Sequence, residues 1–243
     1  EITTRLVGSE MCIRDRQHKD WTAFLKGLDA YNEHLTAKGI VYARSMYNIQ
    51  HTVTPNDGML EVKLECIRPD MEIHYTTDGS EPTATSPLYE KIVPVKEALT
   101  LKGATFAHGR QMGKTLILPV RWNLATAKPV LGTNPTEKLL TNGIRGSLKY
   151  SDFEWCSWAD NDSVSFTIDL LKPEMLNTLT LGCITNNGMA IHKPASVRVE
   201  VSDDNSKFRE AVVQSFTSEE IFREGNFICL LYTSDAADEL DGV

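Results

Sequence analysis

The sequence predicts a mainly β protein in which an N-terminal helix precedes a small β-sandwich and an incomplete β jelly roll. Apolar residues recur at three- and four-residue steps early in the chain, which is typical of an amphipathic helix. Beyond residue 51 they alternate with polar residues, as half-buried strands require. Turn signals such as Asp78-Gly79 separate the short strands, and this spacing favours packed antiparallel sheets.

Both ends of the chain are expected to be of artificial origin. Residues 1–16 and 229–243 resemble translated sequencing-library adapters of the transposon type, so they are excluded from the fold prediction. The natural segment would then be about 17–228, cut from a longer gene. The whole chain has a net charge of −8 and the natural segment is also acidic, which argues against a nucleic-acid partner. No stretch predicts a membrane span.

The first predicted element is a helix that begins after Asp20. Asp20 suits the N-cap, and Gly39 suits the C-terminal end. An apolar face of this kind needs a packing partner. Residues 17–50 are therefore predicted to end a domain whose remainder precedes them. The apolar face consists of Trp21, Phe24, Leu25, Leu28, Tyr31 and Leu35.

Residues 51–126 are predicted to form the β-sandwich. Strands are expected over 60–65, 71–75, 98–106 and 114–122. Asp78-Gly79 and His108-Gly109 supply turn residues that tolerate a positive φ. The segment 127–135, with two prolines and one glycine, is predicted to be a linker.

Residues 127–228 are predicted to form a second β domain. Strands are expected over 164–170, 176–181, 197–201 and 211–216, with a turn at Gly188. The alternation over 197–201 is the clearest of these signals. We expect a jelly roll without its closing strands, which would leave sheet edges and apolar surface uncovered.

Several motifs resemble known families. The runs 73–82 (IHYTTDGSEP), 86–89 (SPLY) and 101–106 (LKGATF) resemble the fibronectin-like C-terminal domain of bacterial β-N-acetylhexosaminidases of glycoside hydrolase family 20. The runs 140–143 (LTNG) and 199–204 (VEVSDD) resemble the coagulation factor five/eight type C, or discoidin, domain. Residues 21–47 resemble the last barrel helix and exit of the hexosaminidase catalytic domain, in Bacteroidetes enzymes especially.

These resemblances imply a function for the chain. It would be a non-catalytic accessory region of a secreted, periplasmic or surface-exposed exo-β-N-acetylhexosaminidase, which removes terminal N-acetylhexosamine from glycans. The sandwich would support the missing catalytic barrel of the same chain. The discoidin module would bind glycans that end in N-acetylhexosamine or galactose. Two alternatives remain open: a glycan-binding or adhesion module, or a structural spacer, of another secreted glycosidase.

No catalytic group is predicted. In family 20 the acetamido oxygen of the substrate attacks the anomeric carbon, and the resemblance implies an Asp-Glu pair in the barrel that assists this attack. The adjacent pair Asp238-Glu239 lies in the adapter-like end. The acidic pairs at 203–204 and 219–220 are expected in turns or surface loops, where solvated carboxylates are common.

The candidate binding residues lie in an aromatic-rich stretch of the second domain. Aromatic side chains stack on the apolar faces of sugar rings, and polar groups beside them bind hydroxyls. Trp155 is better suited to a core position, whereas Tyr150 and Trp158 could either bind sugar or pack beneath the loops. The predicted carbohydrate-binding residues are Tyr150, Trp158, Arg145 and Asp160.

No cofactor or metal centre is predicted. The six histidines occur singly and are expected at surface or strand positions, and the cysteines form no CxxC pair, so a zinc site is not expected. The discoidin pattern usually has Asp where this chain has Asn142, in a loop that often helps to hold calcium. Because an amide is a poorer calcium ligand than a carboxylate, Asn142 disfavours a structural calcium.

Overall fold

The computed structural model describes residues 20–159 and 163–233, and the chain divides into two units, 1–45 and 46–243. In the first unit, helix α2 spans Trp21–Ala37. The Asp20 side chain accepts a hydrogen bond from the Ala23 N–H at 3.0 Å. Gly39, just beyond the C-cap Lys38, has a φ of 68°, a conformation that glycine adopts without steric cost. Both predicted helix ends are therefore confirmed.

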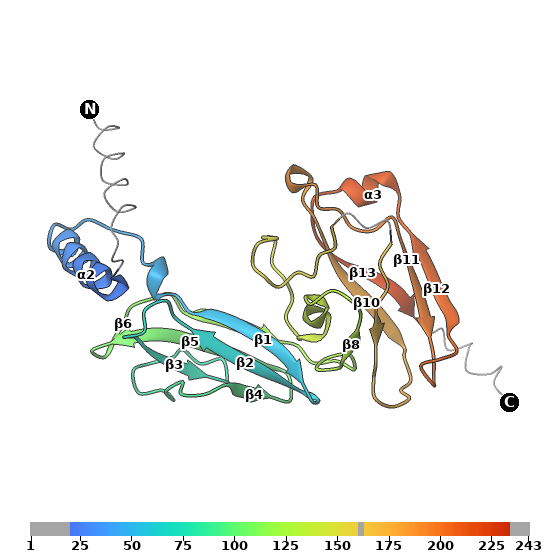
Figure 1. Cartoon of the computed structure of the whole chain (residues 1–243), viewed down its shortest axis with the longest axis horizontal. Coiled ribbons are helices and arrows are strands. Elements are labelled where there is room, and N and C mark those ends of the chain that lie inside the picture. The colour runs from blue at the N-terminus through green and yellow to red at the C-terminus, as the bar shows by residue number, and fades with distance from the viewer. Residues whose placement is uncertain (1–19, 160–162, 234–243) are drawn as a thin grey trace. The chain divides into compact units, whose positions relative to one another are not determined.

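A short 3-10 helix, η1 (Ser45–Tyr47), spans the boundary between the units, and the second unit continues with a β-sandwich of two antiparallel sheets (Figure 1). One sheet has the order β1-β2-β4. In the other, β5 pairs with each of its three neighbours. The strands are β1 (Gln50–Asn56), β2 (Met59–Glu65), β3 (Glu72–Thr76), β4 (Val93–Val95), β5 (Leu99–Ala107), β6 (Arg110–Gln111) and β7 (Leu116–Val120).

The apolar faces of these two sheets meet in a single core. Leu60 and Val62 of β2 are fully buried, as is Leu101 of β5. The alternating pattern that predicted β2 is thus the pattern of its burial, because successive side chains of a strand point to opposite faces. The core is completed by Ile49, Val53, Leu64, Ile73, Val93, Val95, Leu118, Val120 and Ala127.

Strands β1 and β4 were not predicted, and each contains a proline. Pro55 and Pro94 interrupt the usual strand signal, since proline has no N–H to donate to a ladder. Both strands lie at the edges of the β1-β2-β4 sheet. An edge strand pairs on one side alone, so it tolerates a proline that a central strand would exclude.

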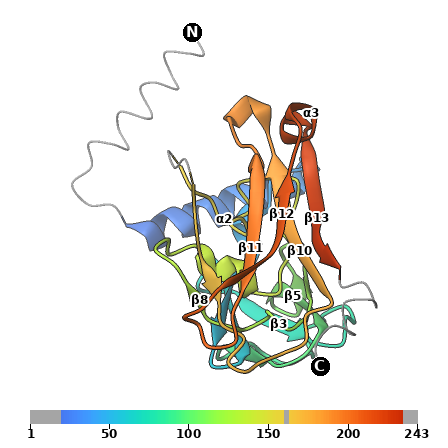
Figure 2. The same cartoon turned by 90° about the vertical axis from the view of Figure 1, so that its right-hand side faces the viewer.

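The second domain contains small antiparallel sheets (Figure 2). Strand β10 (Thr178–Thr185) pairs with β13 (Gly225–Thr233), and β11 (Ser196–Val201) pairs with β12 (Arg209–Ser215). The shorter β8 (Val130–Leu131) pairs with β9 (Thr167–Ile168). The remaining elements are η2 (Glu137–Thr141), η3 (Asn187–Met189) and α3 (Ser218–Phe222). The predicted mainly β class with an N-terminal helix is confirmed.

Three details of this domain differ from the predicted elements. The segment predicted as a linker, 127–135, contains Ala127, which is buried in the sandwich core, and residues 130–131, which form β8. The strand predicted over 164–170 is reduced to two residues, Thr167–Ile168. Strand β13 was not predicted, and it continues through 229–233, within the adapter-like end. The artificial origin of that end, the domain boundaries and the discoidin identity remain predictions.

Within residues 20–159 and 163–233, no helix has both the length and the apolar character that a membrane-spanning helix needs.

Candidate functional site

The Asp78 turn is held by its own polar groups. The Asp78 Oδ1 atom accepts hydrogen bonds from the Ser80 N–H at 2.9 Å and the Ser80 hydroxyl at 2.6 Å. These donors lower the pKa of Asp78. Gly79 has a φ of 77°, as the predicted turn requires. Since the carboxylate already serves the turn, its observed role is structural.

One carboxylate in each of the acidic pairs 203–204 and 219–220 also has a structural role. Asp204 Oδ1 accepts hydrogen bonds from the Ser206 and Lys207 N–H groups, both at 2.9 Å, and these backbone donors lower the pKa of Asp204. Glu220 lies in helix α3, not in a loop as expected, and forms a capping box with Thr217. The pair Asp238-Glu239 lies outside the described residues.

The aromatic-rich stretch forms a turn closed by Asp152 and Trp155. Asp152 accepts hydrogen bonds from the Ser147 N–H at 2.6 Å and the Glu154 N–H at 3.0 Å. Trp155 donates its indole N–H to the Ser147 carbonyl at 3.1 Å. A Cβ on Gly146 would lie 2.4 Å from the Trp155 ring, so glycine is needed for this close approach. Trp155 is therefore a half-buried anchor of the loop.

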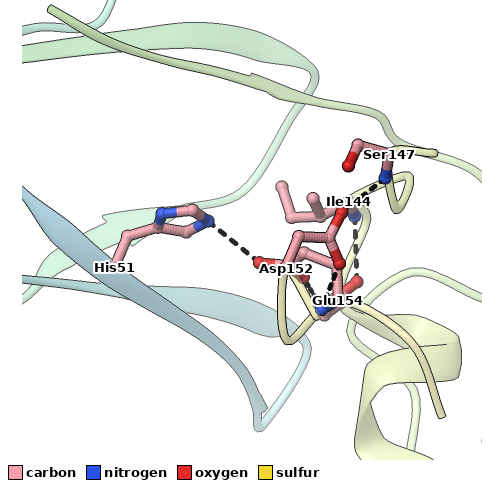
Figure 3. A network of polar contacts seen from close by, with 6 residues as sticks. His51, Ile144, Ser147, Asp152 and Glu154 are labelled. Carbon is pink, nitrogen blue, oxygen red and sulfur yellow. Dashed lines mark hydrogen bonds and ion pairs between the residues drawn. The ribbon is translucent and has the colours of Figure 1, made fainter. Parts of the chain in front are cut away.

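A polar network links this loop to the sandwich (Figure 3). Glu154, whose side chain is 9% exposed, receives a hydrogen bond from Asn142 Nδ2 at 2.8 Å and contacts His51 Nε2 at 2.9 Å. The fully buried Asn142 accepts a hydrogen bond from the Ile144 N–H with its Oδ1 atom. His51 lies on β1, 103 residues before Glu154 in the chain. No local sequence pattern predicts this network, because its residues are far apart in the chain.

The role of Asn142 is decided by this network. Its amide donates to one carboxylate and accepts from one backbone N–H, so both of its polar atoms are engaged within the protein. An aspartate there would place a second carboxylate against Glu154. In the parts of the chain that the structure describes, no three His, Cys, Asp or Glu side chains are grouped to hold a metal ion.

The cysteines lie at half-buried or buried positions. Cys66 and Cys156 are half-buried, whereas Cys183 is buried, and all three are free thiols. Burial raises the pKa of the Cys183 thiol to about 12. A thiol with this pKa stays protonated at neutral pH, so Cys183 behaves as a small apolar side chain.

The predicted binding residues divide between two places. Arg145 and Tyr150 lie exposed on the loop that Asp152 closes. Trp158 is half-buried, stacks on Phe166 with ring centroids 5.8 Å apart, and donates its indole N–H to Glu137 Oε1 at 3.3 Å. Among the described residues, no hydrogen bond or ring contact joins Trp158 to Arg145 or Tyr150. Asp160 lies outside the described residues.

Trp158 borders a cavity of about 260 Å³. This volume is close to the lower end of the range for small-molecule sites, about 300 Å³. Most of its lining side chains are polar, and Glu137 is the buried charged group among them. No local sequence pattern predicts that Glu137 is buried, because its burial depends on tertiary packing. The lining includes Thr133, Asn134, Glu137, Trp158, Ser163 and Ser165.

One part of the chain matches a known protein family. Residues 55–116 match the family model described as the chitobiase/beta-hexosaminidase C-terminal domain. A search of curated proteins found no match. The matched segment extends from β1 to the first residue of β7, and so covers most of the sandwich. This part of the chain is thus similar to a hexosaminidase-type C-terminal domain.

Proposed function

We propose that this chain is a non-catalytic accessory region of an exo-β-N-acetylhexosaminidase. The first sandwich would support the catalytic barrel, helix α2 would be the last helix of that barrel, and the second domain would bind carbohydrate. The observation that carries the proposal is the match of residues 55–116 to the chitobiase/beta-hexosaminidase C-terminal domain. We also propose that the parent enzyme is exported, as the resemblance implies.

A non-catalytic role agrees with the use of the carboxylates. Hydrolysis of a glycoside requires carboxyl groups free to donate a proton or to orient the substrate. Asp78 and Asp204 close turns, Glu220 caps a helix, and Glu154 joins the two β domains. Each of these groups has a structural partner.

The cavity beside Trp158 supports carbohydrate binding. It combines an aromatic side chain with hydroxyl and carboxylate groups, the combination that binds sugars. Tyr150 and Arg145 would form a separate contact on the exposed loop. Asp160, which lies outside the described residues, is kept as a proposed binding residue. Terminal N-acetylhexosamine and galactose are the proposed ligands.

The gene upstream of residue 17 tests the assignment to a hexosaminidase. We expect its translation to contain a (β/α)8 barrel with an adjacent Asp-Glu pair at the carboxyl ends of its strands. The full enzyme should hydrolyse a chromogenic N-acetylglucosaminide, whereas this chain alone should not. A different catalytic domain upstream would contradict the proposal.

An NMR titration of the chain with N-acetylglucosamine, N-acetylgalactosamine and galactose tests carbohydrate binding. We expect shifts of the Trp158 indole N–H signal, and loss of binding in Trp158→Ala. Tyr150→Ala should weaken binding if the loop contributes. Tyr31→Ala, an exposed tyrosine of helix α2, is the matched control. If none of the sugars changes the spectrum, the second domain is a spacer.

A further inference from the structure

Glu137 places a carboxylate in a buried position beside the cavity. The residue is 3% exposed, on the short helix η2. Within the described residues, its carboxylate accepts one hydrogen bond, from the Trp158 indole, and forms no ion pair. An ionised carboxylate is unfavourable in the interior unless charges or several donors compensate it. One neutral donor at 3.3 Å leaves most of its hydrogen-bonding capacity unused.

The neighbouring Asn134 side chain is committed elsewhere. The Asn134 amide donates to the Ser157 carbonyl at 2.6 Å, and its oxygen accepts from the Thr136 N–H and hydroxyl. The described lining residues include no lysine or arginine. Glu137 is therefore the one ionisable side chain among the described lining residues.

Gly132 makes room for the carboxylate. A Cβ at this position would lie 1.7 Å from Glu137 Oε2 and 2.4 Å from its carboxyl carbon. Any larger residue would displace the carboxylate, because the clash involves its charged end. The Glu137 carboxylate thus packs directly against the backbone of Gly132.

We propose that Glu137 makes the Trp158 cavity selective for a cationic amino sugar, a hexosamine with a free amino group. An ammonium group would supply the charge that the buried carboxylate lacks, through a charge-assisted hydrogen bond. N-acetylation of the sugar removes that charge and adds volume, so a neutral N-acetylhexosamine binds less tightly. The proposal rests on the proposed carbohydrate-binding function, and makes a cationic amino sugar, in place of N-acetylhexosamine or galactose, the preferred ligand of this cavity.

The test compares glucosamine, N-acetylglucosamine and glucose as ligands of the full chain, by NMR titration at about pH 6. At this pH a carboxylate is ionised and a primary amine is protonated. We expect the Kd for glucosamine to be at least about tenfold lower than for either neutral sugar. Glu137→Gln keeps the shape of the side chain and an acceptor for Trp158, and should reduce this ratio to about one.

Two further variants control the experiment. Gly132→Ala keeps the Glu137 charge but displaces it, and should lose the selectivity as Glu137→Gln does. Glu174→Gln removes the same charge from a different cavity, beside Trp122 and Lys128, and should keep the tenfold ratio. The Trp158 indole signal and the amide signals of β11 report whether each variant is folded.

The outcomes separate this inference from the broader function. Equal affinity for glucosamine and N-acetylglucosamine would overturn the selectivity and leave carbohydrate binding in place. A tenfold ratio that persists in folded Glu137→Gln would also overturn it. If no sugar binds, the carbohydrate-binding function fails and the selectivity fails with it. The proposal is supported if Glu137→Gln and Gly132→Ala lose the tenfold affinity ratio while Glu174→Gln keeps it.

Discussion

The two β regions of the chain, the sandwich and residues 127–233, use similar alternating sequences and bury them differently. In the first, apolar and polar residues alternate along β2, and Leu60 and Val62 are fully buried. In the second, β11 alternates equally well, yet Val197, Val199 and Val201 are half-buried. The core of the first sandwich contains twelve buried residues, whereas the buried hydrophobic residues described after Ala127 are Cys183 and Ile184.

The difference shows what a period of two does and does not predict. Alternation places apolar side chains on one face of a strand. Full burial requires a second sheet opposite that face, as the β1-β2-β4 sheet has in the β5 sheet. The two domains should therefore respond differently to the same kind of substitution.

The largest contrast is expected from Leu60→Ala and Leu179→Ala. Leu60 is fully buried, so its truncation leaves a cavity and should lower the free energy of unfolding by about 3 kcal/mol. Leu179 of β10 is half-buried, so Leu179→Ala should lower the free energy of unfolding by less than about 1.5 kcal/mol. Urea unfolding followed by amide signals of β5 and β11 measures each domain separately. Equal losses would contradict the comparison.

The polar link between the domains gives the next largest effect. Asn142→Asp replaces a donor by a carboxylate facing Glu154, and should destabilise the chain by about 3 kcal/mol at neutral pH. The two like charges raise the pKa of one carboxyl group in the folded variant, so the loss should shrink as the pH falls below that raised value. Urea unfolding at several pH values measures this dependence.

A second substitution provides the control for Asn142→Asp. In the double variant Asn142→Asp with Glu154→Gln, the glutamine amide can donate to the new carboxylate, so much of the stability should return. Failure of this rescue would show that the space around Asn142, and not the charge pair, decides the effect.

A smaller loss is expected from His51→Ala. This change leaves Glu154 Oε1 without its partner on β1 while Asn142 still serves Oε2, and should cost about 1 kcal/mol. Hydrogen exchange at the Ile144 amide should become faster, because this N–H donates to Asn142. His34→Ala, in the exposed part of helix α2, is the control and should change neither quantity.

The smallest effects are expected at the exposed turns of Asp78 and Asp204. Hydrogen bonds lower the pKa of both carboxyl groups in the folded chain. Each contribution to stability is therefore present above the unfolded pKa of about 4 and is lost as the pH falls through the lower folded pKa. Asp204→Asn should reduce the urea midpoint at neutral pH more than Asp78→Asn does, since Asp204 accepts two backbone N–H donors. The difference should vanish in strong acid.

Much of the fold follows from local chemistry. Helix α2 ends where Asp20 and Gly39 predict, and β2 lies where Leu60 and Val62 alternate. The Asp78-Gly79 turn is likewise a local consequence, because glycine adopts its positive φ at no steric cost. These features depend on residues within a few positions of one another.

Less of the candidate site could be predicted. The sequence indicated Trp158 as a candidate and Trp155 as an anchor, because aromatic residues cluster in one stretch. It did not indicate Glu137, since a single glutamate in a polar segment has no signal for burial. Glu137 and Trp158, which are in contact, lie 21 residues apart in the chain. The packing of the Glu137 carboxylate against Gly132 depends on how β8 and η2 pack.

The sequence by itself determined where the helix, the main strands and the tight turns lie, because backbone preferences and side-chain periodicity act over short distances. Tertiary structure decided that the proline-containing β1 and β4 are edge strands, and that Ala127 belongs to the sandwich core. It also decided that His51 and Asn142 meet at Glu154. These outcomes depend on which surfaces face one another, and sequence periodicity carries no information about the partner of a face.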